Sequence, residues 1–277
     1  MSNPVHEALL RQGLADWNEW RHRNRSVIPD LRGLAMSAAN LSGADLSHAS
    51  LSGAVLIRTK LVGADLRYTD LRSAQLHEAD FTDADLYHAS LEGAALPGAK
   101  LRRSRLVGAS LQSAALTVVD FRSANLSEAD FTRADLRESQ CAGATLERAK
   151  LDGAELFGCR LNGANLRGAT GISARQLEEA IIDDLTSLPE GFAASGADLT
   201  IQSLCGALES MKARSTGSTV PENEVSSYHA LLHTLEIQGI ATDGARIDEN
   251  APGTSVVDAA LFKSRIDSVL DGLRRKL

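Results

Sequence analysis

Three residues near the carboxy-terminal end have the types and spacing of a metal site. His229, His233 and Glu236 stand at i, i+4 and i+7 of a predicted helix, and imidazoles at that spacing can share a zinc ion. The segment YHALLHTLE nevertheless lacks the glutamate base that zinc proteases carry beside their first histidine. We therefore favour a solvated helix face here and keep a metal-binding helical domain as an alternative.

The cysteines offer little chemistry. Cys141, Cys159 and Cys205 are odd in number and show no CxxC spacing, so they indicate neither a disulfide framework nor a structural zinc site. Cys141 and Cys159 occupy positions that elsewhere hold Leu and Ala, and we interpret them as small apolar residues. No nucleophile elbow, P-loop, GxGxxG or HExxH motif occurs. We predict no catalytic, cofactor-binding or metal-binding residue, and no enzyme.

Two groups of polar residues recur at regular intervals and could face a partner. His48, Tyr68 and His88 are 20 residues apart, beside a similar series formed by Asp45, Asp65 and Asp85. We favour ordinary surface for them and keep a recognition stripe as the alternative. A second group could hold an anionic partner, although a solvated face is again favoured. It comprises Lys60, Lys100, Arg102, Arg103, Arg122 and Arg160, with Asp80, Asp83 and Asp120 among them.

These residues lie on a repeat with a period of five. Every fifth residue from Leu31 to Leu166 is a centre, 28 in all, of which 23 are Leu. The other centres are Met36, Phe81, Phe121, Phe131 and Cys141. The residue two before the centre is Ala in 20 of the 28 units, which fill residues 29–168. Leu and Ala must therefore build the core of a chain whose aromatic content is only 4%.

A period of five fits neither ordinary element. A step of five on an α-helix rotates roughly 140°, so the Leu residues would form no stripe. On a flat strand the odd spacing would send successive Leu residues to opposite faces. The chain must therefore turn a corner in every unit, which predicts a β-solenoid. Gly at the second position after the centre, as in Gly43 and Gly53, supports such corners.

The tandem A-[DN]-L-x-x pattern resembles the pentapeptide-repeat family. That resemblance implies a right-handed quadrilateral β-helix with four units per coil, hence about seven coils. We expect the inward centres to form a structural core that includes Leu46, Leu66, Phe81, Leu86, Leu106, Phe121, Phe131, Leu146 and Leu166. A period of 20 also places Val55, Ile57, Pro97, Val118 and Phe157 on one outer face as an apolar strip.

Both ends of a solenoid need covering, because each exposes unpaired backbone groups and apolar side chains. Residues 5–24 predict one amphipathic helix, and both tryptophans, Trp17 and Trp20, lie in it. Its WNEWR element resembles the amino-terminal extension of some family members. At the other end, Ser173 is a suitable N-cap for a helix ARQLEEAII, and this run resembles the terminal cap of many members.

The domain organisation follows from these segments. We assign 1–28 to a helical cap, 29–170 to the β-helix, 171–194 to a terminal cap helix and 195–277 to a three-helix region that resembles no family. Apolar residues define its three helical stripes: Leu199, Leu204, Leu208 and Met211; Val225, Tyr228, Leu232 and Leu235; and Val256, Ala260, Leu261, Ile266, Val269, Leu270 and Leu273. The linkers between them are polar and turn-rich.

Composition narrows the function classes. No stretch approaches 18 uninterrupted apolar residues, so no membrane span is predicted, and the start MSNPVHEALLRQG lacks signal-peptide organisation. We therefore expect a cytoplasmic location. Residues 30–170 carry 17 acidic and 16 basic side chains, whereas residues 171–277 carry 16 and 9.

The sequence favours a non-catalytic interaction scaffold that self-associates, as a homodimer, through its carboxy-terminal helices. The family resemblance supplies an alternative, because some members protect or inhibit type II topoisomerases such as DNA gyrase by imitating DNA. Seven coils at about 4.8 Å each give a rod of about 34 Å. A rod of that length would need roughly 20 negative charges to match the charge density of duplex DNA, whereas the net charge of the repeat is −1. Gyrase is therefore not a favoured partner, and neither direct nucleic-acid nor membrane binding is expected.

Overall fold

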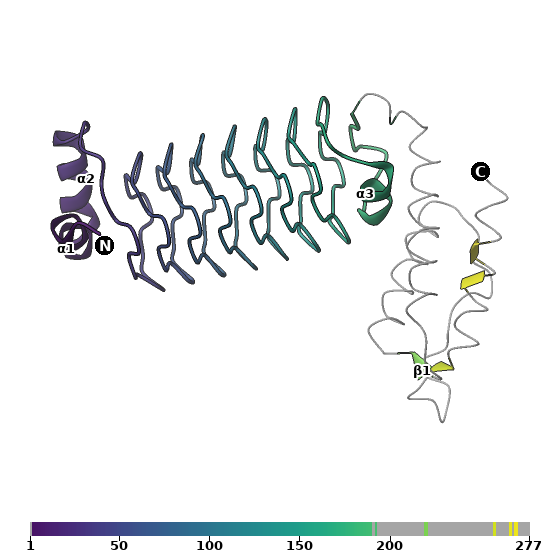
Figure 1. Ribbon diagram of the computed structural model, residues 1–277, viewed down its shortest axis with the longest axis horizontal. Coiled ribbons are helices and arrows are strands. Elements are labelled where there is room, and N and C mark those ends of the chain that lie inside the picture. Colours follow the sequence, from purple (N-terminus) through teal and green to yellow (C-terminus); the bar gives the residue numbers. More distant parts are fainter. Residues whose placement is uncertain are drawn as a thin grey trace. The chain divides into compact units, whose positions relative to one another are not determined.

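The computed structural model describes residues 2–189, Phe192, 219–220, 257–258, 266–267 and 269–270. The chain divides into two compact units, Met1–Ala193 and Ala194–Leu277. The first contains helices α1 (Pro4–Gln12), α2 (Leu14–Arg23) and α3 (Ala174–Glu179), with the repeat between α2 and α3 (Figure 1). None of the helices in the described residues is long and apolar enough to cross a membrane.

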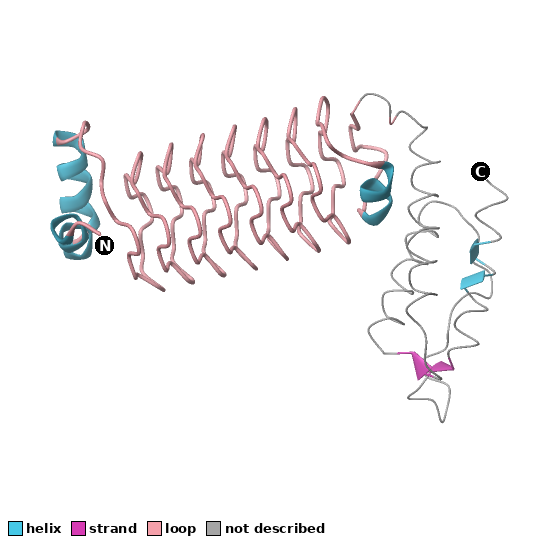
Figure 2. Ribbon diagram, viewed as in Figure 1, coloured by secondary structure: helices cyan, strands magenta, loops and turns pink. Residues whose placement is uncertain are grey.

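The repeat coils as a four-sided solenoid in which each coil uses 20 residues. Parallel bridges join residues 20 apart from Asp30↔Ser50 to Lys150↔Thr170, so four pentapeptide units complete one coil. The bridges are single residues, and Figure 2 therefore draws the stacked coils as loops and turns. The centres and the small residues two before them point inward, which confirms the solenoid predicted from the period.

A β-turn forms each corner of the solenoid. The amide of the third residue after a centre donates to the centre's carbonyl, as Ala54 does to Leu51 at 3.0 Å. The second residue after the centre, here called the corner residue, has a positive φ in all 28 units, and in 16 of them it is not glycine. Positive φ at this turn position is typical of type II turns. The glycine preference at the corners therefore comes from this backbone conformation.

Aspartate and asparagine before the centre stabilise the same turns. All 12 such residues in the repeat accept a hydrogen bond from the backbone amide two residues on, as Asp70 does from Arg72 at 3.1 Å. This contact is an Asx turn. It gives a hydrogen-bond partner to the amide of the residue after the centre, which is not bonded to the neighbouring coil. The D/N of the repeat pattern thus has a structural role.

The amino-terminal segment forms two helices, and the single helix predicted for residues 5–24 is wrong. Gly13 separates them with φ 154° and ψ 156°, a conformation that is essentially restricted to glycine. Trp17 is fully buried and its Nε1 donates to the Asp45 carbonyl at 2.8 Å. Trp20 is half-buried and contacts the rings of His6 and Trp17.

Side chains of this segment satisfy backbone groups of the first coil. Asn18 accepts from the Asp45 amide and donates to the Gly43 carbonyl. Arg21, only 2% exposed, donates to the carbonyls of Ser47 and Val27. On other sides of the coil, His6 Nδ1 accepts from the Asp30 amide and Arg11 donates to the Ala35 carbonyl. Individual side chains of this segment thus form hydrogen bonds with the open backbone groups of the first coil.

At the other end of the repeat, α3 is inserted into the last coil. The bridge offset grows from 20 residues to 21 at Arg160↔Ile181 and 22 at Asn165↔Ser187. Ser173 is the N-cap, as predicted, and forms a capping box with Gln176. The helix is shorter than the predicted ARQLEEAII, because it ends at Glu179 and Ile181 instead bridges to Arg160. The Asp183 carboxylate accepts from the Gly163 amide at 2.8 Å, where a further coil would supply a carbonyl.

Little of the second unit is described. Strands β1 (Thr219–Val220) and β2 (Val257–Asp258) pair antiparallel. Val257 and Asp258 fall within the third predicted helical stripe but lie in a strand, so the prediction is wrong at these two residues, whereas Ile266, Val269 and Leu270 are helical and buried. The rest of the predicted three-helix region, including His229, His233 and Glu236, lies outside the described residues.

Candidate functional site

Three corner residues form a stack of rings on the outside of the solenoid. The His48 and Tyr68 ring centroids are 4.9 Å apart with planes 13° apart, and those of Tyr68 and His88 are 5.7 Å apart with planes 9° apart. All three residues are exposed, Tyr68 by 48%. We call this stack the aromatic ridge.

Neighbouring side chains fix the ridge in place. The Tyr87 ring packs edge-on against His88, with centroids 4.2 Å apart, and the Arg105 guanidinium lies 4.2 Å from the Tyr87 centroid. Arg105 is also 3.2 Å from Asp85. On the next coil, Gly108 leaves room for the His88 ring, since a Cβ there would stand 2.5 Å from a ring atom. The ridge is therefore preorganised.

The ridge is built on strained backbone. His48, Tyr68 and His88 have φ values of 59°, 59° and 51°, a region that costs a non-glycine residue about 1 to 2 kcal/mol. Glycine would avoid this cost, as it does at 12 of the 28 corners. The same positive φ recurs at the other corners, so what distinguishes these three positions is that exposed rings occupy them in successive coils.

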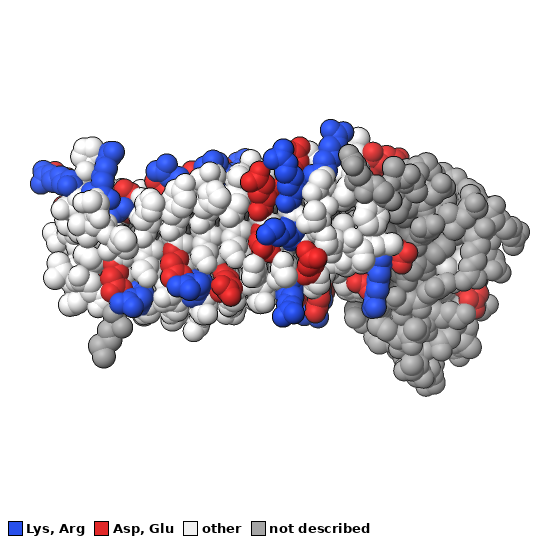
Figure 3. Space-filling view, turned by 45° about the horizontal axis from the view of Figure 1, so that its top comes forward, with Lys and Arg blue, Asp and Glu red and all other residues white. Residues whose placement is uncertain are grey.

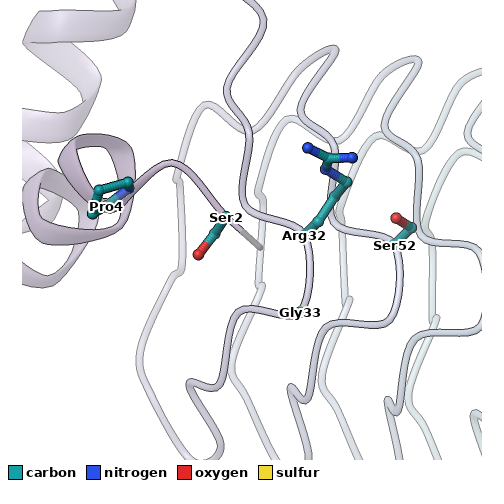
Figure 4. Close-up of a pocket in the computed structure, with 5 residues that line it drawn as sticks. All are labelled: Ser2, Pro4, Arg32, Gly33 and Ser52. Carbon is teal, nitrogen blue, oxygen red and sulfur yellow. The ribbon is translucent and has the colours of Figure 1, made fainter.

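A shallow groove runs along the next corner of the solenoid. It consists of two hollows of about 700 and 600 Å³ that share Ser52. Figure 4 shows the first, where Arg32 and Ser52 project from successive coils near Ser2 and Pro4. Its lining along the coils comprises Arg32, Gly33, Ser52, Gly53, Arg72, Ser73, Glu92, Gly93 and Ser113. The floor is made by small corner residues, and we call this feature the groove.

One side of the solenoid joins these two features. The chain passes from the ridge to the groove in five residues, from His48 to Gly53 and from Tyr68 to Ser73. Serine makes up half of the outward residues between them, which are Ser50, Ser52, Asp70, Arg72, Ser90 and Glu92. We call this side, which lies between the aromatic ridge and the groove, the serine face.

The carboxylates of the repeat are largely neutralised within the chain. Twelve of the 17 acidic residues in 30–170 lie 2.6 to 3.6 Å from an Arg or Lys nitrogen. The Arg32 guanidinium, for example, lowers the pKa of Asp30 to about 2. Figure 3 shows acidic and basic side chains lying beside each other on one view of the surface. Within residues 30–170, therefore, no continuous acidic stripe results.

The predicted basic cluster is neutralised in the same way. Arg102 and Arg122 both approach Asp120, and Arg103 pairs with Asp83 at 2.7 Å. Lys60, Lys100 and Arg160 are exposed beside them. The three arginines are therefore oriented toward carboxylates of their own chain, which weakens the case for an anionic partner at this face.

The predicted apolar strip is only partly exposed. Val55, Ile57 and Pro97 are half-buried, whereas Val118 and Phe157 are 53% and 44% exposed. Val118 is a corner residue with φ 59°, and a β-branched residue there is a genuine outlier.

The inward positions are filled as the period predicts. The nine core residues, Leu46, Leu66, Phe81, Leu86, Leu106, Phe121, Phe131, Leu146 and Leu166, are at most 2% exposed. The buried hydroxyls among them are bonded, since those of Thr59, Thr69, Ser104 and Ser139 each donate to a carbonyl. Within the described residues, no three His, Cys, Asp or Glu side chains gather as a metal site.

Cys141 and Cys159 come together inside the solenoid. Their Sγ atoms are 3.9 Å apart, and the Ser139 Oγ lies 3.3 Å from that of Cys159. Both cysteines are at most 1% exposed. The contact with Cys159 and the burial raise the pKa of the Cys141 thiol well above its usual value. These side chains act as packing residues in this structure.

Sequence reasoning missed the groove and the stacking of the ridge. The 20-residue spacing of His48, Tyr68 and His88 was visible, and so was the row of Gly and Ser at the next corner. The ridge and the groove become neighbours only because their two corners border the same side of the solenoid. The period of five does not indicate which side of the solenoid has a function.

Comparisons with known proteins identify the repeat. A family model for pentapeptide repeats matches eight copies, at residues 39–77, 84–122, 114–153 and 149–180. The chain is similar to the solved structure of HetL, a pentapeptide repeat protein involved in heterocyst differentiation regulation from the cyanobacterium Nostoc sp. strain PCC 7120. Identity to HetL is 36% over 57% of this chain and 71% of HetL, with a TM-score of 0.52.

Two further solved structures are more distant. QnrB1, a plasmid-mediated fluoroquinolone resistance protein, is 17% identical over 63% of this chain and 89% of its own, with a TM-score of 0.35. A pentapeptide repeat protein from the Arabidopsis thaliana thylakoid lumen is 25% identical over 50% of this chain and 89% of its own, with a TM-score of 0.29. Comparison with the curated proteins found no match. The chain belongs to the pentapeptide-repeat family, whose members are right-handed quadrilateral β-helices.

Proposed function

We propose that this protein is a non-catalytic scaffold that holds a protein partner on a rigid rod of about seven coils. The two amino-terminal helices and α3 act as its end caps. The observation that carries this proposal is the division between the inside and the outside of the solenoid. Inward positions of the repeat hold apolar side chains, hydroxyls that are already bonded, or the two packed cysteines, so within residues 29–170 we find no buried set of acids and bases that converges on a reacting atom. Outward positions hold a fixed, preorganised surface.

The aromatic ridge is the part of that surface best suited to bind another protein. Tyr and Arg are enriched among the residues that dominate binding energy at interfaces, and both occur here with two histidines. Because the rings are held by stacking and by Arg105, little side-chain entropy is lost on binding. HetL is involved in the regulation of heterocyst differentiation, and a cytoplasmic scaffold for a regulatory protein is a role of that kind.

Self-association is part of the proposed function. The carboxy-terminal helices expected in 195–277 would form the dimer contact, since their apolar stripes are strong for so small a unit. Light scattering should then give a dimer for the full chain and a monomer for a chain ending near Ala194. A monomeric full-length protein at tens of micromolar would remove this part of the proposal.

The scaffold itself is tested by capture from the native cytoplasm followed by reconstitution. The captured protein, once purified, should bind the full chain with a fixed stoichiometry, and Tyr68→Ala should weaken that complex at least tenfold. Val118→Ala, at an exposed corner residue with the same φ of 59° on another corner of the solenoid, serves as the control. Failure of every purified candidate to bind, or equal binding by both variants, would contradict the scaffold or its site.

Imitation of DNA is the weaker alternative. Most carboxylates of the repeat are paired within the chain and the region nets −1, so the surface does not present the charge density of a duplex. In a DNA gyrase supercoiling assay, we expect the purified protein to leave the rate unchanged. Inhibition at stoichiometric protein concentrations would favour the alternative over the scaffold.

A further inference from the structure

We propose that the serine face pairs with the same face of a second copy, so that the aromatic ridge of each copy lies in the groove of the other. This inference rests on the self-association in the proposed function and adds a contact between the rods. It makes the second copy an occupant of the ridge, so a separate protein partner would have to compete with the second copy for Tyr68. The two copies run parallel and are related by a two-fold axis along the rod direction. Such a contact is isologous, so ridge and groove meet twice.

Symmetry brings the two features together. The ridge and the groove lie on opposite margins of the serine face, five residues apart along the chain. A two-fold axis parallel to the rod exchanges the left and right margins of the face and keeps each residue at its own height. The ridge of one copy therefore faces the groove of the other, whereas an antiparallel pair would set ridge against ridge.

The repeat fixes the register of this contact. The ridge and the groove each repeat once per coil, at a spacing of about 4.8 Å along the rod. A ridge residue and the groove residue five positions later are a quarter of a coil apart, so their heights along the rod differ by about 1.2 Å. His48 then faces Gly53 of the other copy, Tyr68 faces Ser73, and His88 faces Gly93. Each ring meets a corner residue with a small side chain or none. A second copy is the occupant that necessarily shares the repeat distance of the groove.

The charges on the serine face are compatible with this arrangement, although three of them already pair within their own chain: Asp70 with Arg72, Glu128 with Arg148 and Lys150 with Asp130. Across the two-fold axis, the residue just before a centre in one copy faces the residue just after the equivalent centre in the other copy. The two residues differ by about 0.5 Å in height along the rod. Asp70 then faces Arg72, and Lys150 faces Asp152. Further along the same corner as the ridge, toward the carboxy-terminal end of the repeat, Glu128 faces Arg133. None of these pairs opposes like charges, and serines such as Ser50 and Ser90 allow close approach elsewhere.

Cross-linking between two tagged copies tests the contact directly. In a Cys205→Ser background, with Cys141 and Cys159 shielded by burial, one full-length copy carries Tyr68→Cys and the other Ser73→Cys. A short bismaleimide should link the two copies in high yield. The control replaces Ser73→Cys by Ser123→Cys, a serine with nearly the same corner conformation, φ 58° against 54°, on the opposite side of the solenoid. That pair should link at least tenfold less.

A blocking variant gives an independent readout. Ser73→Trp fills the groove and should weaken the dimer at least tenfold, or abolish the Tyr68 cross-link where the carboxy-terminal helices keep the copies together. Ser123→Trp should do neither, and equal melting temperatures would show that both variants fold. A dimer without the Tyr68–Ser73 link would overturn this contact and leave self-association standing. A monomeric wild type would overturn both.

Discussion

The interior of the repeat and the lid formed by α1 and α2 are both well packed, but they specify structure in different ways. Leu106 lies between Leu86 and Leu126 in a row of equivalent positions, and each is fully buried. Arg21 has no equivalent in the described part of the chain, and its contacts with Ser47 and Val27 occur once. The repeat is thus stabilised by many copies of one contact, whereas the lid depends on a few individual hydrogen bonds.

Removing the lid should have the largest effect. A chain beginning near Ser26 exposes the first coil, including Leu31, Leu41 and Leu46, together with the backbone groups that Asn18 and Arg21 satisfy. An open β edge beside apolar surface promotes aggregation, so we expect the shortened chain to aggregate when its sedimentation is compared with that of the full chain. Solubility and a melting temperature equal to those of the full chain would show that the lid is dispensable.

Truncating the core should come second. Leu106→Ala should lower the free energy of unfolding by about 2 to 5 kcal/mol, because it removes buried methyl groups and leaves a cavity between coils. Val107→Ala is the matched control on the outside of the same unit and should cost less than about 1 kcal/mol. Equal losses in denaturant titrations of the two variants would contradict the inward and outward assignment.

A single lid contact should matter less than a core leucine. Arg21→Met keeps most of the apolar stem but removes the donors to two carbonyls and the partner of Asp45, 3.6 Å away. Leaving those buried acceptors unpaired should cost about 1 to 3 kcal/mol. Arg23→Met, two residues on, removes only an exposed pair with Glu19 and should cost at most about 0.5 kcal/mol. Similar unfolding midpoints for the two variants would mean that the hydrogen bonds of Arg21 to the first coil do not contribute to stability.

This difference also explains how far the sequence could be read. The period of five predicted the solenoid, the inward centres and the corners, because each is repeated 28 times in residues 29–168. The break at Gly13 could not be found in this way, since a glycine between two amphipathic turns fits one helix or two. Nor could the pairing of Arg102, Arg103 and Arg122 with carboxylates be read from charge counts. The first depends on the conformation of a single residue, and the second on which side chains the folded coils bring within reach of one another.

The corners offer the smallest test and the most direct one for strain. Val118 has φ 59° and is 53% exposed, so it carries the cost of a left-handed conformation with little packing in return. Val118→Gly removes that cost of about 1 to 2 kcal/mol but gives the unfolded chain more freedom, worth about 0.4 to 1 kcal/mol. We therefore expect a net gain in stability of about 0.5 to 1 kcal/mol, measured as a higher midpoint in denaturant.

The reverse change provides the control for Val118. Gly53 has φ 66°, and a Cβ at this position would have no neighbouring atom within 4 Å, so Gly53→Val meets no clash and tests conformation alone. It should lower stability by about as much as Val118→Gly raises it, and Val118→Ala should change little because alanine still pays for the positive φ. If Val118→Gly instead destabilised the protein, Val118 would have to be making a contact worth more than its strain. The apolar strip that it shares with Val55 and Pro97 would then be the first place to look for that contact.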